Sequence, residues 1–135
     1  MARPTGWNTD HVPAPCPCQS GSAYPECCGP FHHGDAAAPT AERLMRSRYS
    51  AFALDEVEYL LGTWHSTTRP EQLETDSAIR WTGLEIVGRT GGGLLDSAGT
   101  VAFQARFSID GRSDIHRENS RFVREGGRWR YLDGT

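Results

Sequence analysis

The sequence predicts an α+β fold in which helices pack on one face of an antiparallel sheet. Two patterns of hydrophobic residues support this prediction. Apolar residues recur every three or four positions between residues 40 and 64, and at every second position after residue 78. A third observation sets the amino-terminal region apart, because all four cysteines of the 135-residue chain lie between residues 16 and 28. Helices followed by a run of strands typically form layers around one core.

The composition fits one globular domain of ordinary size. Hydrophobic residues make up 37% of the chain and aromatic residues 10%, which is enough to build a core. The net charge of -3 excludes an overall positive field that would attract nucleic acid or anionic lipid. The sequence has no run of 18 apolar residues, and its first fifteen residues lack the apolar stretch of a secretory signal. We therefore expect a cytoplasmic protein with no membrane segment.

The cysteines form two closely spaced pairs, Cys16 with Cys18 and Cys27 with Cys28, joined by a loop with a Ser-Gly-Ser turn at residues 20–22. A disulfide within either pair would close a very small, strained ring. Clustered thiols in a reducing cytoplasm are more often metal ligands than disulfides. Four thiolates can surround one zinc ion at about 2.3 Å. The sequence therefore predicts a structural zinc ion bound by these four cysteines.

Two histidines leave the exact ligand set open. His32 and His33 follow the second cysteine pair, and either can replace one of the adjacent cysteines to give three sulfurs and one imidazole. A catalytic zinc ion is disfavoured, because it needs an open coordination position and usually has histidine or carboxylate ligands.

The cysteine region resembles the SEC-C motif, a small zinc-binding module found at the carboxyl terminus of the translocation ATPase SecA. The resemblance rests on "CPCQSGSAYPECCG", residues 16–29, in which the cysteines, the Ser-Gly turn and Tyr24 follow the pattern of the motif. Gln19 stands where many such motifs have glycine, and the last pair is Cys-Cys where SecA usually has Cys-His. The resemblance implies a zinc ion and a protein partner bound through the motif.

The rest of the chain resembles the YchJ-like family of small bacterial proteins. The strings that carry this resemblance are "GPFHHG", "APTAERLMRSRYSAFALDEVEYLLGTWH", "WTGLEIV" and "HRENSRFVREGGRWRYLDG". The family is similar to nuclear-transport-factor-2-like (NTF2-like) proteins, which implies a cone of helices on a curved antiparallel sheet. We expect an amino-terminal arm with the SEC-C motif at residues 1–34 and an NTF2-like α+β domain at residues 35–135.

A helix is predicted to begin at Thr40, a residue that favours the N-cap position. At about 100° per residue, one face of this helix carries a mostly apolar stripe. The stripe consists of Ala41, Leu44, Met45, Arg48 and Phe52, and the opposite, polar face consists of Glu42, Arg43, Arg46, Ser47 and Ser50. Arg48 therefore lies in the middle of a face that we expect to be buried.

Two further helices are predicted between this helix and the strands. Asp55 followed three positions later by Glu58 matches a capping box at the start of a helix. The apolar positions of that helix are Val57, Leu60, Leu61 and Trp64. A third, short helix is expected at Pro70, because proline favours the first turn of a helix.

The strands follow from alternation and turn signals. Residues 78–88 and 100–109 are predicted strands, separated by a glycine-rich loop at 89–99. Asp110 and Gly111 form a type I′ hairpin signal, and Gly126 with Gly127 gives a second two-residue turn.

These turns predict which residues share the inner face of the sheet. If Asp110 and Gly111 are the whole loop, Ala105 lies opposite His116 and Phe103 lies opposite Glu118, and opposed residues share a face. The predicted inner face is Phe103, Ala105, Phe107, His116, Glu118, Ser120, Phe122, Trp129 and Tyr131.

The apolar face of the first helix is expected to pack on this inner face, which brings Arg48 toward His116 and Glu118. A buried guanidinium and a buried carboxylate each need a partner, and the two can form a doubly hydrogen-bonded ion pair. One interpretation is that the pair only specifies packing. The other is a small-molecule pocket in the cone. A catalytic version is an isomerase or dehydratase in which His116 and Glu118 move a proton while Arg48 stabilises negative charge.

The sequence favours a binding module over an enzyme, with a protein partner at the SEC-C motif or a small molecule in the cone. Nucleic-acid binding is disfavoured although residues 117–130 contain several arginines. Acidic Glu118, Glu125 and Asp133 are interleaved with them, and Arg117 and Arg121 are expected on the outer face of the sheet.

Overall fold

The structure, a computed structural model, describes residues 14–135. A short 3-10 turn, η3 (Tyr24–Glu26), precedes three helices, α1 (Gly29–His32), α2 (Ala41–Leu54) and α3 (Val57–Gly62). Four strands follow, β1 (Ile79–Gly91), β2 (Ala98–Ile109), β3 (Arg112–Glu125) and β4 (Arg128–Gly134). They form one antiparallel sheet in the order β1-β2-β3-β4. The predicted α+β fold is confirmed.

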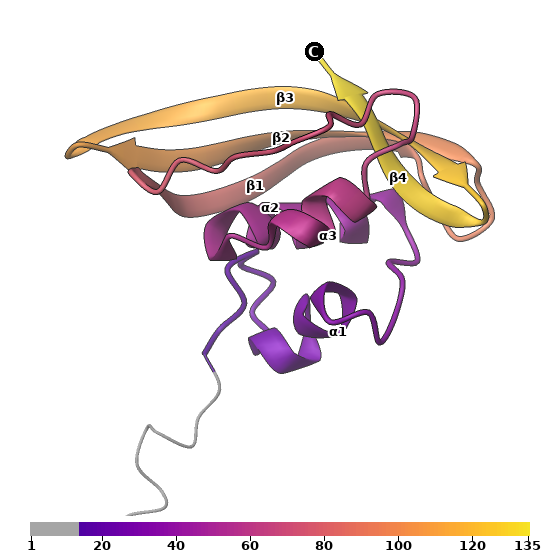
Figure 1. Cartoon of the computed structure of the whole chain (residues 1–135), viewed down its shortest axis with the longest axis horizontal. Helices are drawn as coiled ribbons and strands as arrows, with labels where there is room; N and C mark the ends of the chain where they lie inside the picture. Colours follow the sequence, from indigo (N-terminus) through magenta and orange to yellow (C-terminus); the bar gives the residue numbers. More distant parts are fainter. Residues whose placement is uncertain (1–13) are drawn as a thin grey trace, which may run out of the picture.

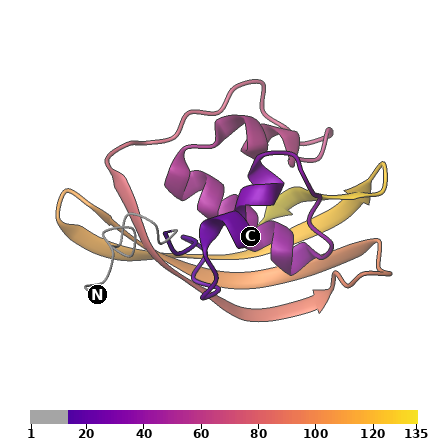
Figure 2. The ribbon, with the colours of Figure 1, turned by 90° about the horizontal axis from the view of Figure 1, so that it is seen from below.

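The molecule has three layers. The curved sheet arches over α2 and α3, and α1 lies on the other side of α2 (Figure 1). Viewed from below, the segment that carries the cysteines covers α2 on the side away from the sheet (Figure 2). Helix α2 is therefore a central layer that is covered on two sides.

The start of α2 is as predicted. Thr40 is its N-cap, and the Thr40 Oγ1 accepts a hydrogen bond of 3.1 Å from the backbone N–H of Arg43. This bond satisfies one of the free N–H groups in the first turn.

The prediction that Asp55 caps α3 is wrong. Asp55 instead ends α2 in the left-handed conformation, with a φ of 62°. The backbone N–H of Glu56 reaches back 2.8 Å to the carbonyl of Ala51, as in the turn that commonly closes a helix. Glu56 is the N-cap of α3 and makes no side-chain capping bond. The two helices are so close in sequence that the end of the first occupies the residue expected to begin the second.

The short helix predicted at Pro70 is also absent from the described chain, where β1 follows α3 through a loop. This loop is held to the sheet, since the Thr68 hydroxyl donates to the Leu132 carbonyl at 2.7 Å. Leu73 is the single apolar residue between 70 and 77, which is too few to bury a helical face.

The predicted hairpin registers are confirmed. All four central residues of the two turns have positive φ, as type I′ turns require: Asp110, Gly111, Gly126 and Gly127. In β2 and β3, Ala105 pairs with His116 and Phe103 pairs with Glu118. In β3 and β4, Phe122 pairs with Tyr131.

The first hairpin is longer than predicted. Strand β1 continues to Gly91 and β2 begins at Ala98, so that the connecting loop shrinks from the expected 89–99 to residues 92–97. Glycine permits this close pairing, because a Cβ on Gly99 would lie 2.4 Å from the backbone nitrogen of Gly92. Register shifts after Trp81 and after Ile86 are irregularities of the kind that bend a sheet.

Candidate functional site

The four cysteine sulfurs form one compact group. Each sulfur lies within 4.8 Å of the others, and all four residues are buried free cysteines. The sulfurs of Cys18 and Cys27 are 3.6 Å apart, and those of Cys27 and Cys28 are 3.9 Å apart. A tetrahedron of sulfurs around a zinc ion has edges of about 3.8 Å when each bond is about 2.3 Å. The group can therefore hold a metal ion.

Local backbone geometry builds this group. The chain folds back between the two pairs because the Cys16 N–H bonds to the Ser22 carbonyl at 2.9 Å. Gln19 and Gly21 both have positive φ at this turn. Gly29 follows the second pair, and a Cβ there would lie 2.8 Å from the carbonyl oxygen of Tyr24, so glycine is needed for this close approach.

The thiols of this group shift the pKa values of one another. The neighbouring thiol of Cys28 lowers the pKa of Cys18 to about 4, although burial opposes this change. The interaction with Cys18, together with burial, raises the pKa of Cys28. The neighbouring thiols thus favour the thiolate form of Cys18, and thiolate is the form that binds metal.

The cysteine group is fastened to both α2 and the sheet. The Ser50 hydroxyl of α2 donates to the sulfur of Cys28 at 3.3 Å and lies 3.4 Å from the sulfur of Cys16. The Gln19 side chain contacts the backbone of β1, donating to the Thr82 carbonyl at 3.2 Å and accepting from the Leu84 N–H at 3.3 Å. Gln19, a departure from the usual motif, therefore joins the cysteine loop to the sheet.

The two histidines considered as alternative ligands lie apart from the sulfurs. His32 uses one ring nitrogen to contact the Tyr24 hydroxyl at 2.7 Å and the other to contact the Ser47 carbonyl at 2.8 Å. His33 is exposed at the end of α1. The structure brings together the four cysteines and directs His32 into the contact between α1 and α2.

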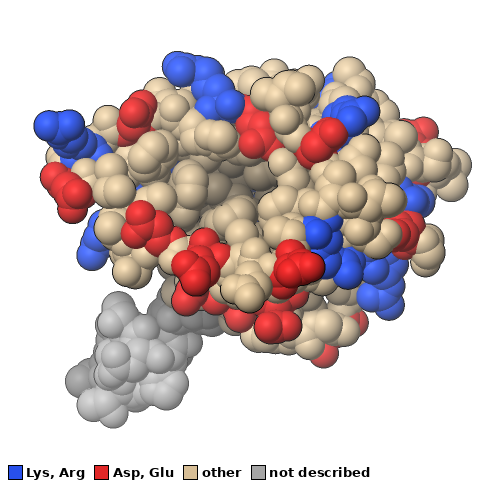
Figure 3. All heavy atoms as spheres, turned by 45° about the horizontal axis from the view of Figure 1, so that its top comes forward, with Lys and Arg blue, Asp and Glu red and all other residues tan. Residues whose placement is uncertain are grey.

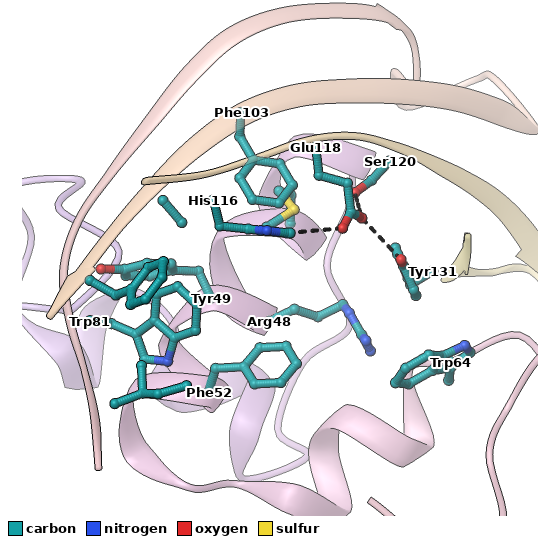
Figure 4. A pocket seen from close by; sticks show the side chains of 14 residues that line it. Arg48, Tyr49, Phe52, Trp64, Trp81, Phe103, His116, Glu118, Ser120 and Tyr131 are labelled. Atoms are coloured by element: carbon teal, nitrogen blue, oxygen red, sulfur yellow. Dashed lines mark hydrogen bonds and ion pairs between the residues drawn. The ribbon is translucent and has the colours of Figure 1, made fainter. Parts of the chain in front are cut away.

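A cavity of about 460 Å³ lies between α2 and the inner face of the sheet. Its walls are mainly aromatic and aliphatic (Figure 4). The apolar residues that line it are Met45, Tyr49, Phe52, Trp64, Ile79, Trp81, Phe103, Ala105, Phe107 and Tyr131. Four polar residues also line it: Arg48, His116, Glu118 and Ser120. Seven of the nine predicted inner-face residues thus line the cavity, whereas Phe122 and Trp129 are buried in the core outside it.

Arg48 is held in place by α3 and two aromatic rings. It is only 4% exposed, and its Nη1 donates to the Leu60 carbonyl at 2.8 Å and to the Thr63 hydroxyl at 2.7 Å. The guanidinium carbon lies 5.0 Å from the ring centre of Trp64 and 4.7 Å from that of Tyr131. Burial lowers the pKa of Arg48 to about 10, so the side chain remains charged at neutral pH.

Glu118 has a separate set of partners. One carboxylate oxygen lies 3.1 Å from His116 Nε2, and the other accepts from the Ser120 hydroxyl at 2.6 Å and the Tyr131 hydroxyl at 3.0 Å. His116 is the most exposed of these groups, with about half of its side chain accessible.

The predicted direct ion pair between Arg48 and Glu118 is not formed. Among residues 14–135, no carboxylate oxygen lies within 4.0 Å of an Arg48 nitrogen. Each group finds other partners, because the last turn of α3 offers a free carbonyl to Arg48 and the sheet offers neighbouring donors to Glu118. The two residues line the same cavity without touching.

Comparison with known proteins shows the family to which this architecture belongs. Residues 40–134 match the family model described as YchJ, middle NTF2-like domain. The chain belongs to the YchJ family. A UPF0225 protein of Streptomyces avermitilis is 52% identical over 122 residues, which cover 90% of this chain and 84% of the relative. A UPF0225 protein of Bordetella parapertussis is 50% identical over 125 residues, covering 90% of this chain and 92% of the relative.

Two solved structures share the fold of this YchJ-family protein. The solution structure of a SEC-C motif containing protein from Rhodopseudomonas palustris has a TM-score of 0.78 and 35% identity, covering 89% of this chain and 96% of that one. The crystal structure of a SEC-C motif containing protein from Psychrobacter arcticus has a TM-score of 0.73 and 32% identity, covering 87% and 80%. Both resemblances inferred from the sequence, to SEC-C motif proteins and to the YchJ-like family, are confirmed.

One part of this YchJ-family site was missed by sequence reasoning, the contact of Trp64 with Arg48. Trp64 was expected on a helix, but it lies beyond α3 and forms a parallel bridge with Tyr131 of β4. The Arg48 guanidinium contacts both of these rings. The hairpin register did place Tyr131 on the inner face, where it could meet Arg48. Nothing in the spacing of Trp64 indicated an arginine partner.

Charged side chains are unevenly distributed on the face of the molecule shown in Figure 3. In Figure 3 the molecule is hollowed near its centre, the hollow is lined mainly by uncharged residues, and acidic side chains gather along one edge. No helix among the described residues is long and apolar enough to cross a membrane.

Proposed function

We propose that the protein is a zinc-stabilised module that binds a small, largely apolar molecule in the cavity beneath the sheet. The observation that carries this proposal is that α2 contacts the cysteine sulfurs and also lines the cavity. Ser50 on one side of the helix contacts two of the clustered sulfurs, and Arg48 and Phe52 line the cavity. A metal that holds the cysteine loop on α2 would therefore support a wall of the cavity.

The chemistry of the donor set favours zinc. Four soft sulfur ligands in a tetrahedral arrangement are typical of structural zinc sites. Cys16, Cys18, Cys27 and Cys28 would take all four coordination positions, so the ion would cross-link the chain and leave no position for a substrate. The metal chemistry in this proposal is thus structural, as expected from the sequence.

The cavity has the character of a ligand site. Its volume of about 460 Å³ falls within the usual range for small-molecule pockets. Aromatic walls supply apolar contact area, and a few polar groups converge at one end. Glu118 is held by three side-chain contacts that fix its position, which suits a binding role. We therefore favour binding over the isomerase or dehydratase alternative.

A neutral fluorescent dye tests the cavity. N-phenyl-1-naphthylamine is expected to bind the metal-loaded protein with increased fluorescence, because its two aromatic groups would enter the apolar cavity. Ala105→Leu places a larger side chain in the cavity and should weaken dye binding by about ten-fold or more. Ala102→Leu is the matched control. Side chains alternate along β2, so Ala102 lies on the face of the strand opposite to Ala105.

The dye experiment has two outcomes that oppose the proposal. One is no dye binding by the wild-type protein. The other is equal dye binding by the two leucine variants, which would place the dye outside the cavity. Thermal melting of each variant shows whether it is folded.

Ser50→Ala is expected to weaken zinc binding by about ten-fold while leaving the protein folded. The hydroxyl of Ser50 donates to the Cys28 sulfur, and such outer contacts orient metal ligands and stabilise their charge. Zinc affinity is measured by competition with a coloured chelator. Ser22→Ala is the control, since Ser22 is exposed at the loop turn. Equal affinities for the two variants would show that the Ser50 contact does not support the metal.

A further inference from the structure

We propose that the ligand of the cavity is a small organic carboxylate with an apolar body, and that Arg48 binds its carboxylate group. This inference rests on the proposed binding function and adds the chemical class of the ligand. It follows from the unused hydrogen-bonding capacity of Arg48, the distribution of charge at the polar end, and the shape of the apolar walls.

Arg48 has one edge without partners. Its Nη1 makes both of its hydrogen bonds, to Leu60 and Thr63, and within residues 14–135 its Nε and Nη2 make none. The guanidinium carbon also lies over the rings of Trp64 and Tyr131, which meet each other at an angle of 82°. Nε and Nη2 lie side by side on one edge, and that edge matches the two oxygens of a carboxylate.

The unpaired charge at the polar end of the cavity is positive. Arg48 is 4% exposed and has no carboxylate oxygen within 4.0 Å in the described part of the chain. Glu118, in contrast, already contacts His116, Ser120 and Tyr131. A buried cation gains more from an incoming anion than an exposed one does, because little water screens the interaction. A cationic ligand would find its counter-charge on Glu118 already engaged.

The acidic side chains that gather along one edge of the face in Figure 3 lie at the surface. Water and salt screen such charges over about 8 Å at physiological ionic strength. We expect them to affect how fast a ligand arrives more than which ligand is bound.

The apolar walls favour a body that contains a ring. Trp81 is tilted against Phe107 with ring centres 5.5 Å apart, and against Phe52 with centres 6.3 Å apart. Such tilted aromatic groups offer both faces and edges to a flat guest. The ligand would place its ring among these side chains and its carboxylate near Arg48, both of which line the same cavity.

A matched series of probes tests this inference on the full-length, metal-loaded protein. The probes are 4-phenylbutyrate, 4-phenylbutyramide and 4-phenylbutylamine, which share one body and differ in the charge of the end group. Isothermal titration calorimetry is expected to show that the acid binds about ten-fold or more tightly than the amide, and that the amine binds most weakly.

Two variants assign the preference to Arg48. Arg48→Met keeps much of the side-chain length, and we expect it to bind the acid and the amide equally. Glu118→Gln removes the negative charge beside the site and should keep or enlarge the preference for the acid. If thermal melting shows that Arg48→Met is not folded, the wild-type probe series and Glu118→Gln still test the preference for a carboxylate.

The outcomes separate this inference from the proposed function. Binding of N-phenyl-1-naphthylamine without preference for the acid over the amide, including no binding of the acid at all, overturns the carboxylate assignment alone. Failure of the dye and all three probes to bind overturns the proposed function as well. A preference for the amine would point to Glu118 and would also contradict the assignment.

Discussion

Cys16→Ser and Cys27→Ser are each expected to reduce bound zinc from about one ion per chain to near zero and to lower the melting temperature by at least about 10 °C. Structural zinc sites contribute on the order of 10 kcal/mol of apparent binding free energy in small domains, comparable with the whole stability of an ordinary domain. Elemental analysis and thermal unfolding measure the two effects. Chelation of the wild-type protein should give the same shift in melting temperature.

The effect should extend beyond the cysteine loop. The four cysteines belong to the same buried cluster as Leu44, Phe122 and Trp129. Loss of the loop would also uncover Ser50, which contacts two of the sulfurs and has 0% exposure. Hydrogen exchange is therefore expected to increase along α2 as well as at residues 16–28.

Ser22→Ala is the control for the cysteine variants, because it changes an exposed residue of the same loop. It should retain about one zinc ion per chain and the wild-type melting temperature. Unchanged metal content in both cysteine variants would refute the ligand assignment. Loss of metal without a change in melting temperature would instead refute its structural role.

Arg48→Ala is expected to lower the free energy of unfolding by about 3 kcal/mol or more, whereas Arg48→Met should change it by less than about 1.5 kcal/mol. Alanine leaves a cavity beside Trp64 and Tyr131, where the guanidinium now packs over both rings. Methionine fills most of that space and also removes the cost of burying a charge without an ion-pair partner. Urea denaturation of the metal-loaded variants measures both values.

The small effect of methionine depends on what the partners of Arg48 do without it. The Thr63 hydroxyl also donates to the Tyr59 carbonyl at 2.8 Å, and the Leu60 carbonyl has a second contact with that hydroxyl at 3.3 Å. The Tyr59 carbonyl also accepts from the Thr63 N–H at 3.0 Å, so without Arg48 the single hydroxyl proton of Thr63 can turn to the Leu60 carbonyl and neither group is left without a partner. An equal loss of stability in the two variants would show that the charge of Arg48, rather than its volume, stabilises the fold. The expected difference would indicate that stability alone does not require an arginine here.

Local rules predicted a large part of this fold. Thr40 caps α2 because its side chain and the N–H of Arg43 are three residues apart, whatever lies elsewhere. Turns at Asp110-Gly111 and Gly126-Gly127 set the register, and the register alone placed His116 and Glu118 on the inner face. The close spacing of the cysteines likewise predicted the grouped sulfurs. Each of these features depends on residues that are near one another in sequence or paired through a short turn.

The sequence by itself therefore determined α2, α3 and the strands, the pairing of the strands and which strand residues face inward. Only the tertiary structure decided what those residues contact. Ser47 and Ser50 were assigned to a polar face, yet both are buried, Ser47 against Tyr59 of α3 and Ser50 against the cysteine sulfurs. Arg48 contacts α3 and two aromatic rings instead of Glu118. Periodicity gives the direction of a side chain but not the element that lies opposite. When several donors and acceptors compete within a core, the partner is chosen by the three-dimensional packing of segments far apart in the chain.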